Sequence, residues 1–170
     1  MADRELIEQA RTLLDLCRAK RLKIASAESC TGGLVAATLT EIAGSSDVFE
    51  RGFVTYSNDA KQTMLGVPPQ TLASHGAVSR ESALAMAEGA LAHAPAELAV
   101  AVTGIAGPGG AVPGKPVGLV HFGAASRGGQ LVHRERQYGD IGRAQVRRAA
   151  VVDALGLLRE LAEQEPYGTR

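Results

Sequence analysis

Apolar residues recur every three or four positions in several segments of the chain, which is the spacing of an amphipathic helix. The last such segment carries Val146, Ala150, Val151, Ala154, Leu155, Leu158 and Leu161 on one face. Ser79 is suited to cap the first turn of one helix, and Gly44 is suited to end another. The predicted helices cover residues 3–19, 34–42, 80–93 and 143–163.

Short β-rich or apolar runs separate the helices and are typical of strands. The predicted strands cover residues 22–25, 53–56, 98–103, 117–125 and 131–137. Helices alternate with strands until the last two strands, which follow each other around the turn 127–129. This order predicts a layered α/β/α fold with a central mixed β-sheet, with residues 1–170 forming a single domain.

The composition narrows the class of protein. Apolar residues make up 45% and charged residues 21%, which is typical of a globular domain and not of a disordered chain. The 18 basic and 18 acidic residues leave no net charge, which argues against nucleic acid as a partner. With two cysteines and no long apolar run, we expect a cytoplasmic protein without a signal peptide or membrane span.

The stretch "SAESCTGG" follows a predicted strand and precedes a predicted helix. Backbone N–H groups at a helix N-terminus attract negative charge, and glycines let a ligand approach the backbone closely. A hydroxyl or thiol at this turn is well placed to attack a carbonyl carbon, so Ser29, Cys30 and Thr31 are candidate nucleophiles. The competing interpretation is that Ser29 or Thr31 only caps the helix.

A nucleophile of this kind needs a base. No acidic partner is evident for the four histidines, which are His75, His93, His121 and His133, so a Ser-His-Asp triad is poorly supported. Lys61 in "TYSNDAKQTMLGV" is an alternative base if burial lowers its pKa from about 10.4 towards about 7–8. The competing interpretation is a solvated surface lysine. No HExxH or CxxC spacing is present, so no metal or other cofactor is expected.

A long glycine-rich loop, "GIAGPGGAVPGK", follows Thr103 at the end of a predicted strand. Loops of this length in compact domains are usually functional or mobile. Because ligands bind at the carboxyl ends of strands in α/β sheets, we expect Ser29, Lys61 and Thr103 to meet at one edge.

Arg143 and Arg147 are four positions apart on the last predicted helix and share one of its faces. Two guanidinium groups suit a phosphate or a carboxylate. The alternative is a solvated face that also includes Arg148.

These segments together resemble the CinA C-terminal domain family, whose characterised members are nicotinamide-mononucleotide amidohydrolases. The similarity is carried by "AESCTGGLVAATLTEIAGSSDVFERGFVTYSNDAK", "LGV", "HGAVS", "VTGIAGPGG" and "KPVGLV", in the family's order, and it extends from about Glu5 to Leu161. The resemblance implies hydrolysis of the carboxamide of nicotinamide mononucleotide to nicotinate mononucleotide and ammonia, without a metal. It also favours a homodimer.

The resemblance assigns roles to individual residues. It implies that Ser29 is the nucleophile, that Lys61 is its general base and that Tyr56 assists one of them. The implied oxyanion donors are the backbone N–H groups around Cys30, Thr31 and Gly32, and the implied substrate contacts are Thr103, Asn58, Gly104, Gly107, Arg143 and Arg147. The chain departs from the family's "GDRxxVR" by reading "GDIGRAQVR", so the arginine that takes the motif position is left open.

Two other interpretations of the same residues stay open. Cys30 could be the nucleophile, because thiols are intrinsically better attackers, although no histidine is evidently near to activate it. The domain could instead be a non-catalytic nucleotide-binding regulatory module associated with competence or damage response, since binding needs the same helix N-terminus, glycine loop and arginines. A protein–protein adaptor would fit the neutral charge but would explain none of the polar residues.

Overall fold

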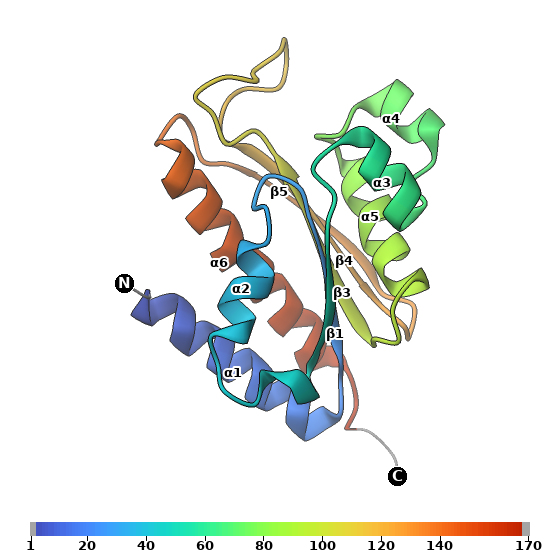
Figure 1. Cartoon of the computed structure of the whole chain (residues 1–170), viewed down its shortest axis with the longest axis vertical. Coiled ribbons are helices and arrows are strands. Elements are labelled where there is room, and N and C mark those ends of the chain that lie inside the picture. The colour runs from blue at the N-terminus through green and yellow to red at the C-terminus, as the bar shows by residue number, and fades with distance from the viewer. Residues whose placement is uncertain (1–2, 168–170) are drawn as a thin grey trace.

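The computed structural model describes residues 3–167. The helices are α1 (Arg4–Lys20), α2 (Leu34–Thr40), α3 (Asn58–Leu65), α4 (Pro69–His75), α5 (Arg80–Ala92) and α6 (Arg143–Gln164), with a short 3-10 turn, η1 (Ser45–Asp47). The strands are β1 (Ile24–Glu28), β2 (Phe49–Val54), β3 (Leu98–Gly104), β4 (Leu119–Ser126) and β5 (Leu131–Gln137). Figure 1 shows the five strands as a central layer, with α1, α2 and α6 on one face and α3, α4 and α5 on the other. The predicted α/β fold is confirmed.

The sheet has the strand order β2-β1-β3-β4-β5 and is mixed, as predicted. Strand β1 runs parallel to β2 and β3, whereas β4 runs antiparallel to β3 and β5. The three parallel strands therefore end at the same edge of the sheet, where a ligand site is expected.

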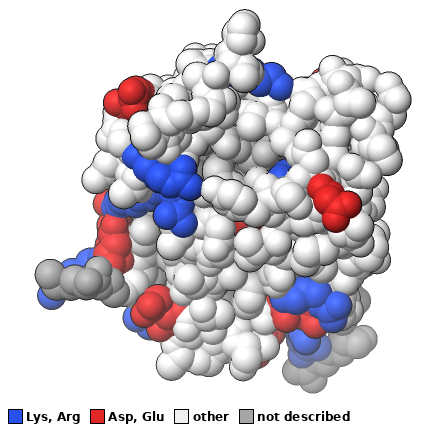
Figure 2. Space-filling view, turned by 45° about the horizontal axis from the view of Figure 1, so that its top comes forward, with Lys and Arg blue, Asp and Glu red and all other residues white. Residues whose placement is uncertain are grey.

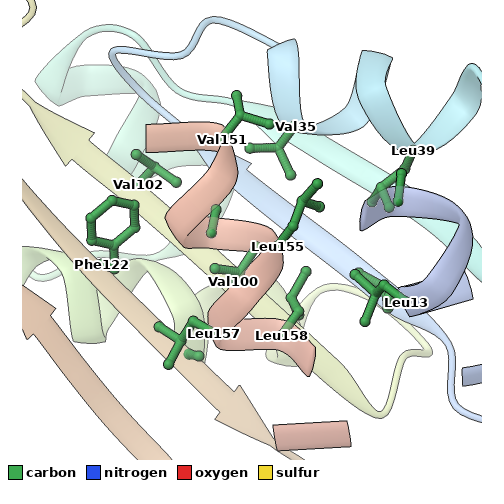
Figure 3. Close-up of a cluster of buried hydrophobic side chains, with 14 of the residues drawn as sticks. Leu13, Val35, Leu39, Val100, Val102, Phe122, Val151, Leu155, Leu157 and Leu158 are labelled. Carbon is green, nitrogen blue, oxygen red and sulfur yellow. The ribbon is translucent and has the colours of Figure 1, made fainter. Parts of the chain in front are cut away.

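Successive side chains of a strand point to opposite faces of a sheet, and this alternation divides the interior into two clusters. Val100 and Val102 of β3 face α6, where Leu155 and Leu158 pack with side chains from α1 and α2 (Figure 3). On the other face the buried side chains of the strands are small, and α5 lies close to them. A Cβ at Gly123 would lie 2.3 Å from the Ala83 carbonyl oxygen of α5, so the close approach requires glycine there.

The structure confirms the four predicted helices, with ends that differ by one or two residues, and Ser79 caps α5 by accepting from the Ser82 N–H at 3.1 Å. The second predicted strand is present, but its predicted bounds of 53–56 are wrong, because β2 covers Phe49–Val54. This edge strand contains charged, exposed residues and has no apolar run. Helices α3 and α4 were not predicted, because they are short and bury few side chains. None of the helices within residues 3–167 is long and apolar enough to cross a membrane.

Candidate active site

Strand β1 ends at Glu28, and the alternation of its side chains sends consecutive residues to opposite faces of the sheet. Glu28 points towards α2, where it accepts hydrogen bonds from the Val35 and Ala36 N–H groups. Ser29 points towards α3 on the other face, where it contacts Lys61. Cys30 returns to the first face and belongs to the apolar cluster with α6. This one turn thus places Glu28 and Cys30 on one face of the sheet and Ser29 on the other.

Lys61 lies in the first turns of α3, and its side chain is 1% exposed. Its Nζ lies 2.9 Å from Ser29 Oγ, 2.8 Å from the Thr55 carbonyl oxygen and 3.4 Å from the Tyr56 carbonyl oxygen. Burial lowers the pKa of Lys61, because the charged ammonium is poorly solvated there. The interpretation of Lys61 as a solvated surface lysine is therefore wrong.

The first turn of α2 is capped by a residue to which the sequence assigned no role. Gly33 occupies the N-cap position and contributes no side chain. The Glu28 carboxylate, 1% exposed, accepts from the Val35 N–H at 2.8 Å and from the Ala36 N–H at 3.1 Å. The Thr31 hydroxyl donates to the same carboxylate at 2.6 Å. Capping by Ser29 or Thr31 is therefore not observed, and the Ser29 hydroxyl is left to Lys61.

The backbone N–H groups of the turn differ in their partners. The Ser29 N–H donates to the Val102 carbonyl at 2.9 Å, and the Gly32 N–H donates to the Ser29 carbonyl at 3.0 Å. Within residues 3–167, the N–H groups of Cys30 and Thr31 donate to no protein acceptor. The Gly32 N–H, predicted as an oxyanion donor, is therefore already engaged, and the two N–H groups before it are the free ones.

A pocket of about 300 Å³ opens beside the Ser29 hydroxyl. The predicted site residues that line it are Ser29, Cys30, Tyr56, Asn58, Lys61, Thr103, Gly104, Gly107 and Arg143. Figure 2, with the upper end of Figure 1 turned forward, shows a hollowed and mostly uncharged surface, with one group of basic side chains at its left and others at the top and the lower right. The expected meeting of Ser29, Lys61 and Thr103 at one edge of the sheet is observed.

Arg143 connects two walls of the pocket. Its Nη1 donates to the Gly107 carbonyl at 2.9 Å, and its Nη2 donates to the Tyr56 hydroxyl at 3.0 Å. The Tyr56 side chain is 61% exposed, and its hydroxyl contacts Arg143 and not the Ser29–Lys61 pair. Thr103 donates from Oγ1 to the Ala77 carbonyl at 2.9 Å and so fixes the segment that precedes α5.

The second arginine does not line this pocket. Arg147 Nε donates to the Cys30 carbonyl at 3.1 Å, and Arg147 Nη2 donates to the Thr31 carbonyl at 3.2 Å. Arg148, the next residue, pairs with Asp3 and Glu5. The predicted common ligand for Arg143 and Arg147 therefore has no support in the geometry, because the two guanidinium groups contact different segments.

The alternative nucleophile is poorly activated. Burial raises the pKa of Cys30 to about 12, so its thiol is protonated near neutrality. Among the described residues that line the pocket there is no histidine. His121 and His133 instead form a pair on β4 and β5, with Nδ1 and Nε2 2.9 Å apart, and burial lowers the pKa of both.

Two contributors to the site were missed from the sequence. The Thr55 carbonyl fixes the Lys61 ammonium, and no sequence pattern identifies a carbonyl acceptor. Glu28 could have been found, because the alternation along β1 sends it to the face opposite Ser29, towards the helix that the turn begins.

The fold and the site define an α/β/α domain with a buried serine–lysine pair at a strand-to-helix turn, an arrangement suited to nucleophilic attack on a carbonyl carbon. Residues 7–162 match the family model of the CinA C-terminal domain, and the chain belongs to that family.

Several relatives cover nearly all of the chain. It is 50% identical over 159 residues to the nicotinamide-nucleotide amidohydrolase PncC of Escherichia coli K12, with 93% of this chain and 95% of that protein aligned. It is 51% identical over 151 residues to a CinA-like protein of Synechococcus sp. RCC307, but these span only 36% of that longer protein.

Solved structures show the same fold. The crystal structure of the competence/damage inducible protein CihA from Agrobacterium tumefaciens aligns with a TM-score of 0.93 and 53% identity, covering 96% of this chain and 99% of that one. A CinA superfamily protein from Klebsiella pneumoniae aligns with a TM-score of 0.89 and 34% identity, covering 94% and 99%.

Proposed function

We propose that this chain hydrolyses the carboxamide of nicotinamide mononucleotide to nicotinate mononucleotide and ammonia. The observation that carries the proposal is the buried Lys61 Nζ, 2.9 Å from Ser29 Oγ, at the wall of a pocket. The similarity to the Escherichia coli nicotinamide-nucleotide amidohydrolase over 95% of that protein supports the choice of substrate.

The surroundings of Lys61 suit a neutral amine. A neutral lysine has two N–H donors and one lone pair. The Thr55 and Tyr56 carbonyls can accept the two donors, which leaves the lone pair for the Ser29 hydroxyl proton. The lowered pKa of Lys61 favours this neutral form. When the amine takes the proton, the same three oxygen atoms can accept from the ammonium.

The proposed reaction has two halves. Lys61 takes the Ser29 proton as Oγ attacks the carboxamide carbon, and the oxyanion accepts from the free N–H groups of Cys30 and Thr31. The C–N bond breaks, the Lys61 ammonium gives its proton to the departing amine, and ammonia leaves an acyl-Ser29 ester. Lys61 then takes a proton from an attacking water molecule. The ester bond breaks as the Lys61 ammonium returns this proton to Ser29 Oγ, and the acid product leaves and loses its own proton to solvent as the carboxylate.

The rest of the pocket is assigned to substrate binding. In the proposal, Arg143 contacts the substrate phosphate, because its guanidinium lies at the pocket wall next to the exposed Tyr56 ring. Thr103, Asn58, Gly104 and Gly107 line the same space and contact the nucleotide. The proposal includes no resident metal or cofactor, a cytoplasmic location and a homodimer.

Ammonia release from nicotinamide mononucleotide tests the proposal, with nicotinamide as a control for the need for the nucleotide. We expect the wild-type protein to release ammonia and Ser29→Ala to lower kcat by at least about 10³-fold. Calorimetry with the same variant should still detect substrate binding. Binding without release by the wild-type protein would support the regulatory module instead, and near wild-type turnover by Ser29→Ala would exclude Ser29 as the nucleophile.

A further inference from the structure

Arg147 connects the last helix of the chain to the turn that carries the nucleophile. Its guanidinium donates to two consecutive carbonyls, those of Cys30 and Thr31, across a sequence separation of 117 and 116 residues. Both contacts are partly buried. Two donors of one rigid, planar group on two neighbouring peptide units fix the orientation of both units.

The geometry of the peptide bond links these contacts to the proposed oxyanion site. In a trans peptide the C=O and N–H bonds point in opposite directions. The only cis peptide bond in the described part of the chain joins Gly107 to Pro108. The Cys30 carbonyl and the Thr31 N–H belong to one peptide unit. When Arg147 holds that carbonyl, the Thr31 N–H points away from Arg147, and no residue within 3–167 accepts from it.

The opposite side of the turn is held by Glu28. The Thr31 hydroxyl donates to the Glu28 carboxylate at 2.6 Å, while the Thr31 carbonyl accepts from Arg147 at 3.2 Å. The next N–H, of Gly32, closes the turn onto the Ser29 carbonyl. Thr31 is therefore held through its side chain and its carbonyl by groups of opposite charge, and its N–H remains free.

We propose that Arg147 is a positioning residue, which holds the Cys30 and Thr31 carbonyls and so keeps the free N–H groups of this turn in place for the oxyanion formed beside Ser29. The inference rests on the proposed amide hydrolysis. It separates Arg147 from Arg143, which contacts the pocket directly. Loss of Arg147 removes two partly buried hydrogen bonds from these carbonyls and lets the peptide unit rotate. The cost falls on the transition state, because the donor matters most when the oxyanion forms.

The test compares glutamine variants of three arginines on α6 with nicotinamide mononucleotide as substrate. For Arg147→Gln we expect kcat to fall about 10–100-fold with KM within about threefold of wild type, since loss of a whole oxyanion donor costs about 10²–10³ in kcat. Arg143→Gln should raise KM. Arg148→Gln, which removes a cation paired with Asp3 and Glu5 outside the pocket, should change neither constant.

A second substrate separates positioning from phosphate binding. Nicotinamide riboside lacks the phosphate, so a phosphate contact adds to kcat/KM only for the nucleotide. Arg147→Gln should lower kcat/KM for both substrates by the same factor, whereas Arg143→Gln should act mainly on the nucleotide. An Arg147→Gln variant that raises KM, spares kcat and loses the preference for the nucleotide would overturn the positioning role, and so would one that matches wild type.

Folding and the proposed function are controlled separately. Thermal unfolding of each variant measures any loss of structure. Arg147→Lys keeps the positive charge but has a single donor nitrogen in place of the planar fork, so it should give a kcat between those of wild type and Arg147→Gln. If Arg147→Gln does not fold, Arg147→Lys carries the test with the same expected split between kcat and KM. A wild-type protein that releases no ammonia contradicts the proposed function. An active wild type with an unimpaired Arg147 variant contradicts only this inference.

Discussion

The face of the sheet covered by α1, α2 and α6 buries mostly large aliphatic side chains, whereas the face covered by α3, α4 and α5 buries mostly alanine. The first cluster includes Leu155, Leu158 and Phe122, and it contains the thiol of Cys30. The second lies beside Ser29, Lys61 and the pocket. Most of the apolar burial is thus on one face and the reactive pair is on the other.

The difference shows how a lysine can be buried beside a serine. Small side chains let α5 approach the sheet, and Gly89 of α5 lies against Leu65 at the C-terminal end of α3. Lys61 lies in the first turns of the same helix. Burying an amine is costly unless its hydrogen bonds are made, and the Thr55 and Tyr56 carbonyls make them. The α6 face, which has most of the apolar burial, then contributes most of the hydrophobic stabilisation of the fold.

The largest effect is expected from Lys61→Met, which keeps the length of the side chain and removes the amine. We expect kcat to fall by about 10²–10⁴-fold, the contribution of a general base. The free energy of unfolding should fall by no more than about 1 kcal/mol, because the variant removes a buried amine together with its hydrogen bonds. Steady-state ammonia release and denaturant unfolding check both statements, and retained turnover would contradict the role of Lys61.

Leu155→Ala on the α6 face is expected to lower stability strongly and kcat little, the reverse of Lys61→Met. Leu155 is fully buried, so its truncation leaves a cavity and should lower the free energy of unfolding by about 2–5 kcal/mol. Under conditions where the variant is folded, kcat should stay within about twofold of wild type, since Leu155 is outside the pocket lining. A large loss of kcat without loss of stability would contradict the division of the fold into a face that stabilises it and a face that carries the reactive pair.

The α6 face could be predicted from the sequence and the other face only in part. Helices α1 and α6 bury long aliphatic side chains at helical spacing, so their periodicity predicts them. Helices α3 and α4 are short, and β2 is an exposed edge strand with charged residues, so no such pattern marks them. Their formation depends on contacts with the rest of the fold.

The site divides in the same way. Ser29, Lys61 and Thr103 could be placed at one edge because each comes at or after the end of a predicted strand, and the family resemblance then implied the roles of Ser29 and Lys61. The contact of Arg147 with the Cys30 carbonyl could not be predicted, because it joins a side chain to a backbone atom 117 positions away. An i, i+4 spacing says that two arginines share a helix face, but it does not say which of them reaches a ligand.

Two glycines sharpen the comparison, because the same substitution should have opposite signs on the two faces. A Cβ at Gly89 of α5 would lie 2.1 Å from the Leu65 carbonyl oxygen, so Gly89→Ala must push α5 from α3 and should cost about 1–3 kcal/mol. At Gly156 of α6 the nearest atom is 3.9 Å away, and alanine there should stabilise the helix by about 0.5–1 kcal/mol.

Denaturant unfolding of the two variants measures both effects. Gly89→Ala should also lower kcat, because displacement of α3 moves Lys61 relative to Ser29. If both substitutions shift the free energy of unfolding in the same direction, close packing of α5 against α3 does not explain the effect of Gly89→Ala.

The smallest expected effect is a dependence of stability on pH that comes from Lys61. Burial lowers the pKa of Lys61 in the folded protein, while the unfolded chain has the ordinary value of about 10.4. Between these two pKa values the unfolded chain binds more protons than the folded protein, so the free energy of unfolding rises with pH. Below the pKa of the folded protein, the full cost of burying the charged Lys61 ammonium remains. The Tm of Lys61→Met relative to that of wild type should therefore be higher at about pH 7 than at about pH 10.

The pH dependence of kcat/KM measures the ionisation of Lys61 independently of stability. Because the neutral amine is the base, kcat/KM should rise with pH to a plateau, with an apparent pKa below about 10.4. Lys23→Met, at an exposed position, controls for the removal of one positive charge. A pH-independent difference in Tm together with an ascending limb near about 10.4 would mean that Lys61 is an ordinary lysine. The face covered by α3, α4 and α5 would then bury the Lys61 amine without lowering its pKa enough for it to act as a base.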